Sequence, residues 1–258
     1  METALYLLPV GLSDAKPEEV IPAGNLEILK ELKYFVVENL RTARRWIKRC
    51  DHSFSFEGVE MVELNEHTPS EEVCSMLEPL RNGKSIGVMS EAGCPAVADP
   101  GSDIVAAAQK EGLRVIPLVG PSSILMGLMA SGFNGQSFCF HGYLPIDEKE
   151  KRKTLQQLEK ESQRFNRTQI FIETPYRNNK LLEIMINTLS PDTRICVACD
   201  ITDREKESIV TRTVAEWSGR EFDYNKKPTI FFIYGGDKES GTRRSASARI
   251  SDRRKGRR

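Results

Sequence analysis

Long apolar runs are missing from this chain of 258 residues. Its longest apolar stretch, Val115 to Ala130, is interrupted by two prolines, two glycines and two serines, which leaves too little to cross a bilayer. The N-terminal segment also lacks a basic region followed by an apolar one, so the sequence predicts no secretory signal. We therefore expect a cytoplasmic protein with no membrane partner.

Histidine is scarce, and the cysteines are irregularly spaced. The three histidines, His52, His67 and His141, show no metal-ligand spacing. Cys196 and Cys199 form a CxxC, but the surrounding letters ICVACD indicate a buried strand with small side chains. No second CxxC or paired histidine follows. The sequence predicts neither a disulfide framework nor a metal site.

Two common nucleotide-binding motifs are also absent. The chain contains no GxGxxG and no GxxxxGK[ST], which argues against a dinucleotide-binding fold and a P-loop ATPase. What is present is an ordinary folded composition, 39% hydrophobic and 29% charged, on a chain long enough to bury a sizeable core.

A net charge of zero hides an asymmetry along the chain. Residues 241–258 hold eight basic residues and one acid, a charge of +7, and the remaining body carries 29 basic against 36 acidic residues, or −7. So few apolar residues predict a disordered basic tail over 238–258. The tail could follow a phosphate backbone or be a solvated extension, and both interpretations stay open.

Short aliphatic runs alternate with amphipathic stretches in the first half, which predicts an α/β layer with a largely parallel sheet. In the second half three strands lie close together, which favours a mixed sheet with hairpins. The fold class is therefore two α/β domains, 1–119 and 120–237, divided where Gly120-Pro121 breaks the chain. The expected strands are Ala4–Leu8, Tyr34–Val37, Met61–Leu64, Ile86–Met89, Arg114–Leu118, Ser137–Tyr143, Thr168–Ile172, Arg194–Cys199, Glu207–Thr213 and Pro228–Tyr234. The longer helices are expected at Leu26–Leu32, Leu40–Arg49, Glu71–Arg81, Asp103–Glu111, Ser122–Ala130, Lys149–Phe165 and Arg177–Leu189.

The densest functional signal is the segment SEAGCPAVADPG, residues 90–101. It follows the expected strand Ile86–Met89, and ligands bind at the carboxyl ends of strands in open α/β sheets. Its small residues and prolines allow the backbone to approach a ligand closely. Asp99 is alternatively a helix cap. A second segment, VGPSSILMGLMASG, joins a strand end to an apolar helix, and Ser122 either caps that helix or faces a ligand.

These two segments, with FCFHGYLP and IETPYR further along, resemble the tetrapyrrole methylase superfamily, whose members use S-adenosylmethionine (SAM). Within it they resemble the bacterial small-subunit rRNA ribose 2′-O-methyltransferase branch. The resemblance spans about residues 4–235 and implies a homodimer with SAM bound in a cleft between the two domains.

Two departures from the branch concern the acceptor side. The branch opens with TPIGNL, whereas this chain has Leu8-Pro9-Val10-Gly11-Leu12-Ser13, which keeps the proline and glycine but replaces the asparagine. The branch also carries EDTR, and here Asn39 stands between Glu38 and Leu40 in place of the aspartate. An asparagine cannot act as a base.

Carried over residue by residue, the resemblance implies a set of site residues. Glu38 and Arg41 serve the acceptor in catalysis. No metal ligands are predicted, and the sequence leaves open whether a metal assists the transfer. The expected cofactor-site residues are Glu91, Gly93, Val97, Ala98, Asp99, Ser122, Ser123, Thr174 and Pro175, with Pro9 and Gly11 on the acceptor side of that site. Thr174 and Pro175 could instead simply end a strand.

The leading functional hypothesis is SAM-dependent 2′-O-methylation of a ribose in small-subunit rRNA, with the rRNA or the subunit as partner. Methylation of a tetrapyrrole or another small acceptor is the first alternative, and a SAM- or RNA-binding protein without turnover is the second. RNA would require positive charge. Two patches could supply it: Arg41, Arg44, Arg45, Lys48 and Arg49, and then Lys149, Lys151, Arg152 and Lys153.

Overall fold

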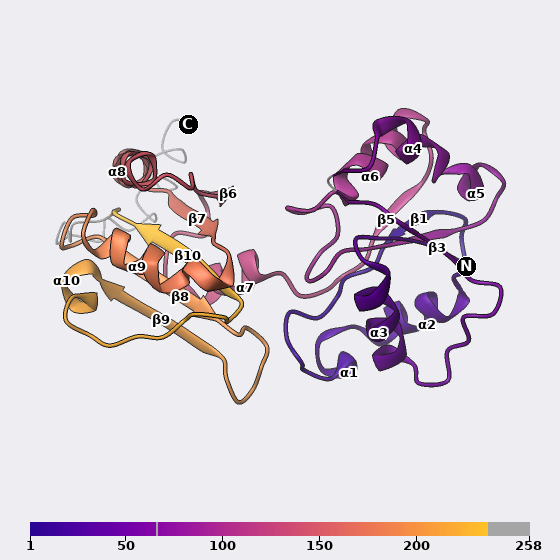
Figure 1. Cartoon of the computed structure of the whole chain (residues 1–258), viewed down its shortest axis with the longest axis horizontal. Coiled ribbons are helices and arrows are strands. Elements are labelled where there is room, and N and C mark those ends of the chain that lie inside the picture. The colour runs from indigo at the N-terminus through magenta and orange to yellow at the C-terminus, as the bar shows by residue number, and fades with distance from the viewer. Residues whose placement is uncertain (66, 237–258) are drawn as a thin grey trace, which may run out of the picture.

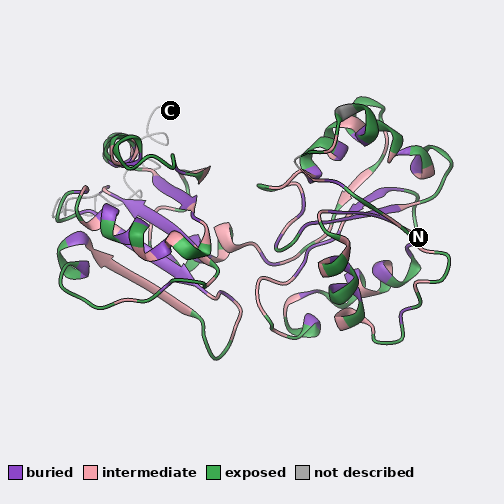
Figure 2. Ribbon diagram, viewed as in Figure 1, coloured by how far each residue is buried: buried purple, intermediate pink, exposed green. Residues whose placement is uncertain are grey.

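A computed structural model describes residues 1–65 and 67–236, and these fold into two α/β units that lie side by side (Figure 1). Each unit is built on one five-stranded sheet. The buried residues concentrate on the strands and on the helix faces turned toward them (Figure 2). The basic tail predicted at 238–258 lies outside the described residues.

The first sheet is parallel throughout, in the order β3-β2-β4-β1-β5. Because all strands are parallel, their carboxyl ends meet at one edge of the sheet. Helices α1 to α3 cover one face and α4 to α6 the other (Figure 1). The elements are β1 (Leu5–Leu7), α1 (Pro17–Val20), α2 (Ala23–Glu31), β2 (Tyr34–Val37), α3 (Leu40–Cys50), β3 (Glu60–Glu63), α4 (Ser70–Ser75), α5 (Glu78–Arg81), β4 (Ile86–Met89), α6 (Gly101–Lys110) and β5 (Val115–Pro117).

The second sheet is mixed, in the order β6-β7-β10-β8-β9, with β6 parallel to β7 and the other pairs antiparallel. Helix α7 packs on one face, and α8, α9 and α10 pack on the other. The elements are α7 (Ser123–Ser131), β6 (Phe138–Tyr143), α8 (Glu148–Phe165), β7 (Thr168–Ile172), the 3-10 turn η1 (Pro175–Arg177), α9 (Asn178–Ile186), β8 (Arg194–Cys199), β9 (Ser208–Thr213), α10 (Val214–Trp217) and β10 (Thr229–Tyr234). The predicted pair of α/β sheets, one parallel and one mixed, is confirmed.

The predicted continuous helix Glu71–Arg81 is wrong. The chain forms α4, breaks at Met76 and Leu77, and resumes as α5. Pro79 explains the break, because its ring would clash with the carbonyl of residue 75 and it has no N–H to donate. Helix α1 was not predicted, since it is a single turn within a segment interpreted as an insert.

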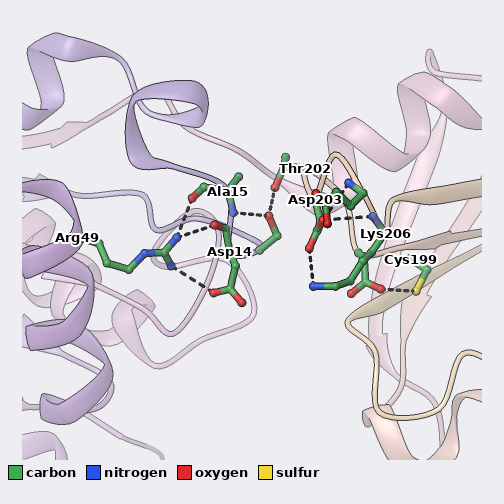
Figure 3. A network of polar contacts seen from close by, with 10 residues as sticks. Asp14, Ala15, Arg49, Cys199, Thr202, Asp203 and Lys206 are labelled. Atoms are coloured by element: carbon green, nitrogen blue, oxygen red, sulfur yellow. Dashed lines mark hydrogen bonds and ion pairs between the residues drawn. The ribbon is translucent and has the colours of Figure 1, made fainter.

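The two units are joined by residues 118–122 and touch through the segment after β1. Pro9 is buried, and a side chain on Gly120 would meet the Pro9 ring at 2.1 Å, so the two backbones lie in direct contact. Ser13 Oγ lies 2.9 Å from Thr202 Oγ1 across the two units (Figure 3). Leu12 packs against the apolar cluster of the second sheet.

Within residues 1–65 and 67–236, no helix has both the length and the apolar character needed to cross a membrane.

Candidate functional site

The loop between β4 and α6 holds its backbone in an unusual conformation. Gly93, Ala96 and Ala98 all have positive φ angles, of 77°, 67° and 63°. Left-handed backbone costs about 1–2 kcal/mol for each alanine. Asp99 Oδ1 offsets part of this cost by accepting hydrogen bonds from the backbone N–H groups of Ala96, at 3.0 Å, and Gly101, at 2.7 Å. Asp99 therefore ties the loop to the first residue of α6, and strain of this kind is typical of ligand-binding loops.

A cavity of about 320 Å³ lies between this loop and the edge of the second sheet where β6, β7 and β8 end and β10 begins, and we call it the first cavity. Its walls combine aliphatic side chains with a few hydroxyl groups and the carboxylate of Glu173. Five predicted cofactor residues line it: Gly93, Val97, Ser122, Ser123 and Pro175. Residues 12, 92, 94, 124, 143, 172, 173, 198, 201 and 228–230 complete the lining.

The remaining predicted cofactor residues do not line the first cavity. Ala98 and Asp99 shape the loop behind it, and Pro9 is buried against Gly120. Thr174 precedes the 3-10 turn, where its backbone N–H donates to Glu173 Oε1 at 2.8 Å. Ser122 combines both expected roles, since it lines the cavity while its Oγ accepts the Leu125 N–H at 3.5 Å.

Glu173, which the sequence analysis passed over, is the most strongly bonded group in the cavity wall. Its buried carboxylate accepts from Lys151 Nζ at 2.8 Å and from Arg177 Nη2 at 2.7 Å, besides the Thr174 amide. Burial raises the pKa of Glu173, but the hydrogen bonds from Lys151, Thr174 and Arg177 outweigh it and hold the pKa below its ordinary value. Lys151 is only 4% exposed, so the expectation that it belongs to a surface patch for RNA is wrong.

A second cavity of about 370 Å³ lies on the other side of the segment after β1. The first unit contributes Gly11, Thr42, Arg45, Arg49 and Glu91, and the second contributes Asp200, Asp203 and Lys206. Figure 3 shows Arg49 and Lys206 on opposite sides of this space. Gly11 and Glu91 were predicted for the cofactor site, and the structure places both here.

The two cavities share a wall made of Leu12, Ala92 and Pro228. Leu12 stands where the resembling branch has asparagine, so an apolar side chain separates the two spaces. Pro9 and Gly11 match the family motif, whereas Leu12 departs from it, so the motif gives no sign that Leu12 belongs to the site. Pro228 begins the approach to a strand more than 200 residues away, and no local pattern links it to Leu12.

Glu38 anchors the loop after β4. Its Oε2 accepts the backbone N–H of Glu91 at 2.9 Å, while the Glu91 carboxylate accepts from Thr42 Oγ1 at 2.6 Å. Burial raises the pKa of Glu38, and the neighbouring charges of Asp99 and Glu91 add to the rise. Glu38 lines neither cavity. Its carboxylate therefore faces the loop backbone.

Helix α3 carries the predicted basic patch, and its cap explains Asn39. Asn39 Oδ1 accepts the backbone N–H groups of Arg41 and Thr42 at 2.9 and 3.2 Å, which is an N-cap. Arg41 is exposed and lines neither cavity, and within the described residues no ion pair joins it to Glu38. Arg49 Nη2 donates to the carbonyls of Asp14 and Ala15 and so secures the segment after β1 (Figure 3).

The residues around the first cavity fit SAM. Adenine and the methionine chain need apolar walls, which Leu12, Ile124 and Ile230 provide. The polar groups of SAM need donors and acceptors, which the hydroxyl groups of Ser122 and Ser123 can supply. The N–H and C=O of Gly93 are already hydrogen-bonded to Val10, so Gly93 contributes space rather than polar contacts. A Cβ at Gly93 would lie 3.4 Å from Leu12 and 3.7 Å from the Pro121 carbonyl, so the absence of a side chain there keeps the space open.

Comparison with known proteins agrees with this geometry. A ribosomal RNA small subunit methyltransferase I from Bacillus subtilis is 32% identical over 83% of this chain and 69% of its own length. The protein of the same name from Vibrio cholerae is 27% identical over 90% and 77%. Among solved structures, the methyltransferase CobJ superposes with a TM-score of 0.59 at 18% identity, covering 91% of this chain and 94% of CobJ.

The family model described as Tetrapyrrole (Corrin/Porphyrin) Methylases matches residues 4–217. That match spans the first sheet, every strand of the second sheet except β10, the loop after β4 and most of the lining of both cavities. The chain therefore belongs to the tetrapyrrole methylase family.

Proposed function

We propose that this protein is a SAM-dependent methyltransferase that methylates the 2′-hydroxyl of a ribose in small-subunit rRNA in the cytoplasm. The observation that carries the proposal is the pair of adjoining cavities. One fits SAM, and the other is lined by both charges: Arg45, Arg49 and Lys206 with Asp14, Glu91, Asp200 and Asp203. The names of relatives that are 27–32% identical support the choice of acceptor.

SAM, when bound, supplies a methyl group activated by its sulfonium sulfur. The residues of the chain position the cofactor and the acceptor. Gly93, Val97, Ser122 and Ser123 hold the cofactor in the first cavity, and Leu12 and Pro228 border the place where the acceptor meets it. Holding the two reactants in contact and in line supplies several kcal/mol of the barrier.

On the acceptor side we assign proton acceptance to Glu91. Its carboxylate borders the second cavity next to the shared wall, and Thr42 Oγ1 orients it with a 2.6 Å hydrogen bond. Glu91 would accept the proton of the acceptor hydroxyl as that oxygen takes the methyl group from SAM, whose carbon–sulfur bond breaks and leaves S-adenosylhomocysteine. Arg41 and Arg45, exposed on α3, attract the phosphates on either side of the acceptor ribose.

The test uses small ribosomal subunits from a strain deleted for this gene and SAM with a labelled methyl group. We expect label in the rRNA and, after nuclease digestion, one 2′-O-methylated nucleoside detected by mass spectrometry. Label in a base, in a ribosomal protein or nowhere would overturn the proposal.

A tetrapyrrole acceptor is the second candidate, because the matching family model is described by that chemistry. Incubation with uroporphyrinogen and precorrin preparations distinguishes it, since methylation of either without methylation of subunits would favour this acceptor. SAM binding without transfer to any of these acceptors would favour a binding protein without turnover.

We also propose that the protein acts as a homodimer. Leu125 and Met129 lie one turn apart on α7 and are 52% and 82% exposed, and Val119 just before the helix is 75% exposed. An apolar face of this kind marks an interaction surface. Light scattering should give twice the chain mass for the wild type and for a Val62→Glu control, and a lower mass for Leu125→Glu with Met129→Glu.

A further inference from the structure

A third hollow, of about 320 Å³, lies on the second unit beside the second cavity, which we now call the acceptor cavity. We name it the basic hollow. Four cations, Lys206, Arg212, Arg220 and Lys227, line it together with Trp217 and Phe222. Lys206 also lines the acceptor cavity, so the two spaces adjoin at this side chain.

The charge of the basic hollow is suited to an anion. Its two acids, Glu221 and Asp223, leave a surplus of two positive charges among the lining residues, and one of the four cations, Lys206, forms an ion pair with Asp203 at 3.1 Å. Within the described residues, Arg212, Arg220 and Lys227 form no ion pair; Arg220 and Lys227 donate to the backbone carbonyls of Glu216 and Asp223 instead. Arg212 projects from β9, opposite Ile195 in the strand pairing, and is half-buried.

The floor of the hollow is aromatic. Phe222 and Tyr224 lie parallel with ring centroids 6.3 Å apart, and Trp217 meets Phe222 edge-on at 6.3 Å. Phe222 is half-buried, so part of its surface is open. Grooves that pair cations with aromatic rings are the usual way to bind single-stranded nucleic acid without reading its sequence.

We propose that the basic hollow binds the phosphate and base of a nucleotide next to the methylated ribose. The inference rests on the proposed function, because it extends the RNA path from the acceptor cavity past Lys206. An RNA path of this kind would also give a role to the cations of the second unit that lie away from the first cavity. A small acceptor that fills only the second cavity would leave the hollow without a role.

The test compares two double variants that remove the same charge from exposed or half-exposed positions. Arg212→Gln with Arg220→Gln alters the hollow, and Lys160→Gln with Arg164→Gln alters the outer surface of α8 as the matched control. The probe is a single-stranded oligoribonucleotide, and its affinity for the full chain is measured at several salt concentrations. SAM affinity and circular dichroism establish that both variants keep the fold.

Each phosphate contact on single-stranded RNA contributes about 0.7 to the log–log salt slope. Loss of two contacts should flatten the slope by about 1.4 and weaken binding roughly 25-fold at 0.1 M salt, whereas the control changes neither by a comparable amount. With ribosomal subunits, KM should rise and kcat should stay unchanged. Equal slopes for the two double variants would overturn the proposal, whatever the transfer assay gives. Failure of the wild type to methylate subunits would instead refute the proposed function, whatever the slopes.

Discussion

At the scale of single residues, glycine at position 93 is explained by two separate demands. The φ angle of 77° suits glycine, and the space beside its Cα opens into the first cavity. Gly83 has the same φ angle, but a Cβ there would meet nothing within 4 Å. A substitution at Gly83 therefore causes backbone strain alone, whereas the same substitution at Gly93 also excludes a ligand from the first cavity.

We predict that Gly93→Val abolishes SAM binding and Gly83→Val leaves it intact. Both should lose about 1–2 kcal/mol of stability from left-handed backbone. Calorimetric titration with SAM measures the first effect, and denaturant unfolding measures the second. Unchanged SAM affinity in Gly93→Val would contradict the cofactor assignment.

The two carboxylates near the shared wall should differ in their effect on rate. Glu91→Gln should lower kcat at least about 100-fold, because proton acceptance typically contributes that much or more. Glu38→Gln should keep kcat within a few-fold, because the glutamine oxygen can still accept the Glu91 N–H. Single-turnover methyl transfer at saturating SAM measures both. The reverse order of effects would make Glu38 the base.

Leu12 is half-exposed and borders both cavities. Leu12→Ala should lower kcat more than about tenfold, because small misplacements of reacting atoms are costly in rate. SAM affinity should change by less than the rate. Leu26→Ala, an equal truncation on α2 outside both cavities, serves as the control. If the two variants have the same kcat, the shared wall plays no part in alignment.

At the scale of secondary-structure elements, the buried cluster of Lys151, Glu173 and Arg177 fixes α8 to the turn after β7. Lys151→Met breaks a buried pair and should cost roughly 3 kcal/mol, while Lys153→Met, in an exposed pair with Glu150, should cost less than about 1 kcal/mol. Urea unfolding measures both. Similar costs would show that the buried pair adds nothing.

The same cluster gives a pH dependence with a defined sign. Because the folded-state pKa of Glu173 is lowered, its contribution to stability is present above the ordinary glutamate pKa. That contribution is lost as pH falls through the lowered folded value. The stability difference between wild type and Lys151→Met should therefore shrink on acidification below about pH 4, near the ordinary glutamate value.

The elements could largely be predicted from the sequence, because apolar runs such as Ile86–Met89 and Arg194–Cys199 are bounded by polar or turn residues. The helix broken at Pro79 was missed because periodicity alone ignores the missing N–H. Helix α1 was missed because four residues give no period to recognise.

At the scale of the whole molecule, the sequence located residues of both units around the first cavity but missed the wall that the two cavities share. The loop after β4 is contiguous, so its chemistry can be read from one segment. Leu12 and Pro228 meet only because residues 118–122 bring the two units together. Glu173 was hidden for a related reason, since its partner Lys151 lies 22 residues away in a helix whose charges suggested an exposed face.

The central claim is that SAM occupies the first cavity and that the acceptor reaches it past Leu12, Ala92 and Pro228. The most direct test is a crystal structure of the protein with S-adenosylhomocysteine, the product that SAM leaves after transfer. We predict that the ligand contacts Gly93, Val97 and Ser122 and that its sulfur lies at the shared wall. A ligand bound in the second cavity, or with its sulfur turned away from Leu12, would contradict the account.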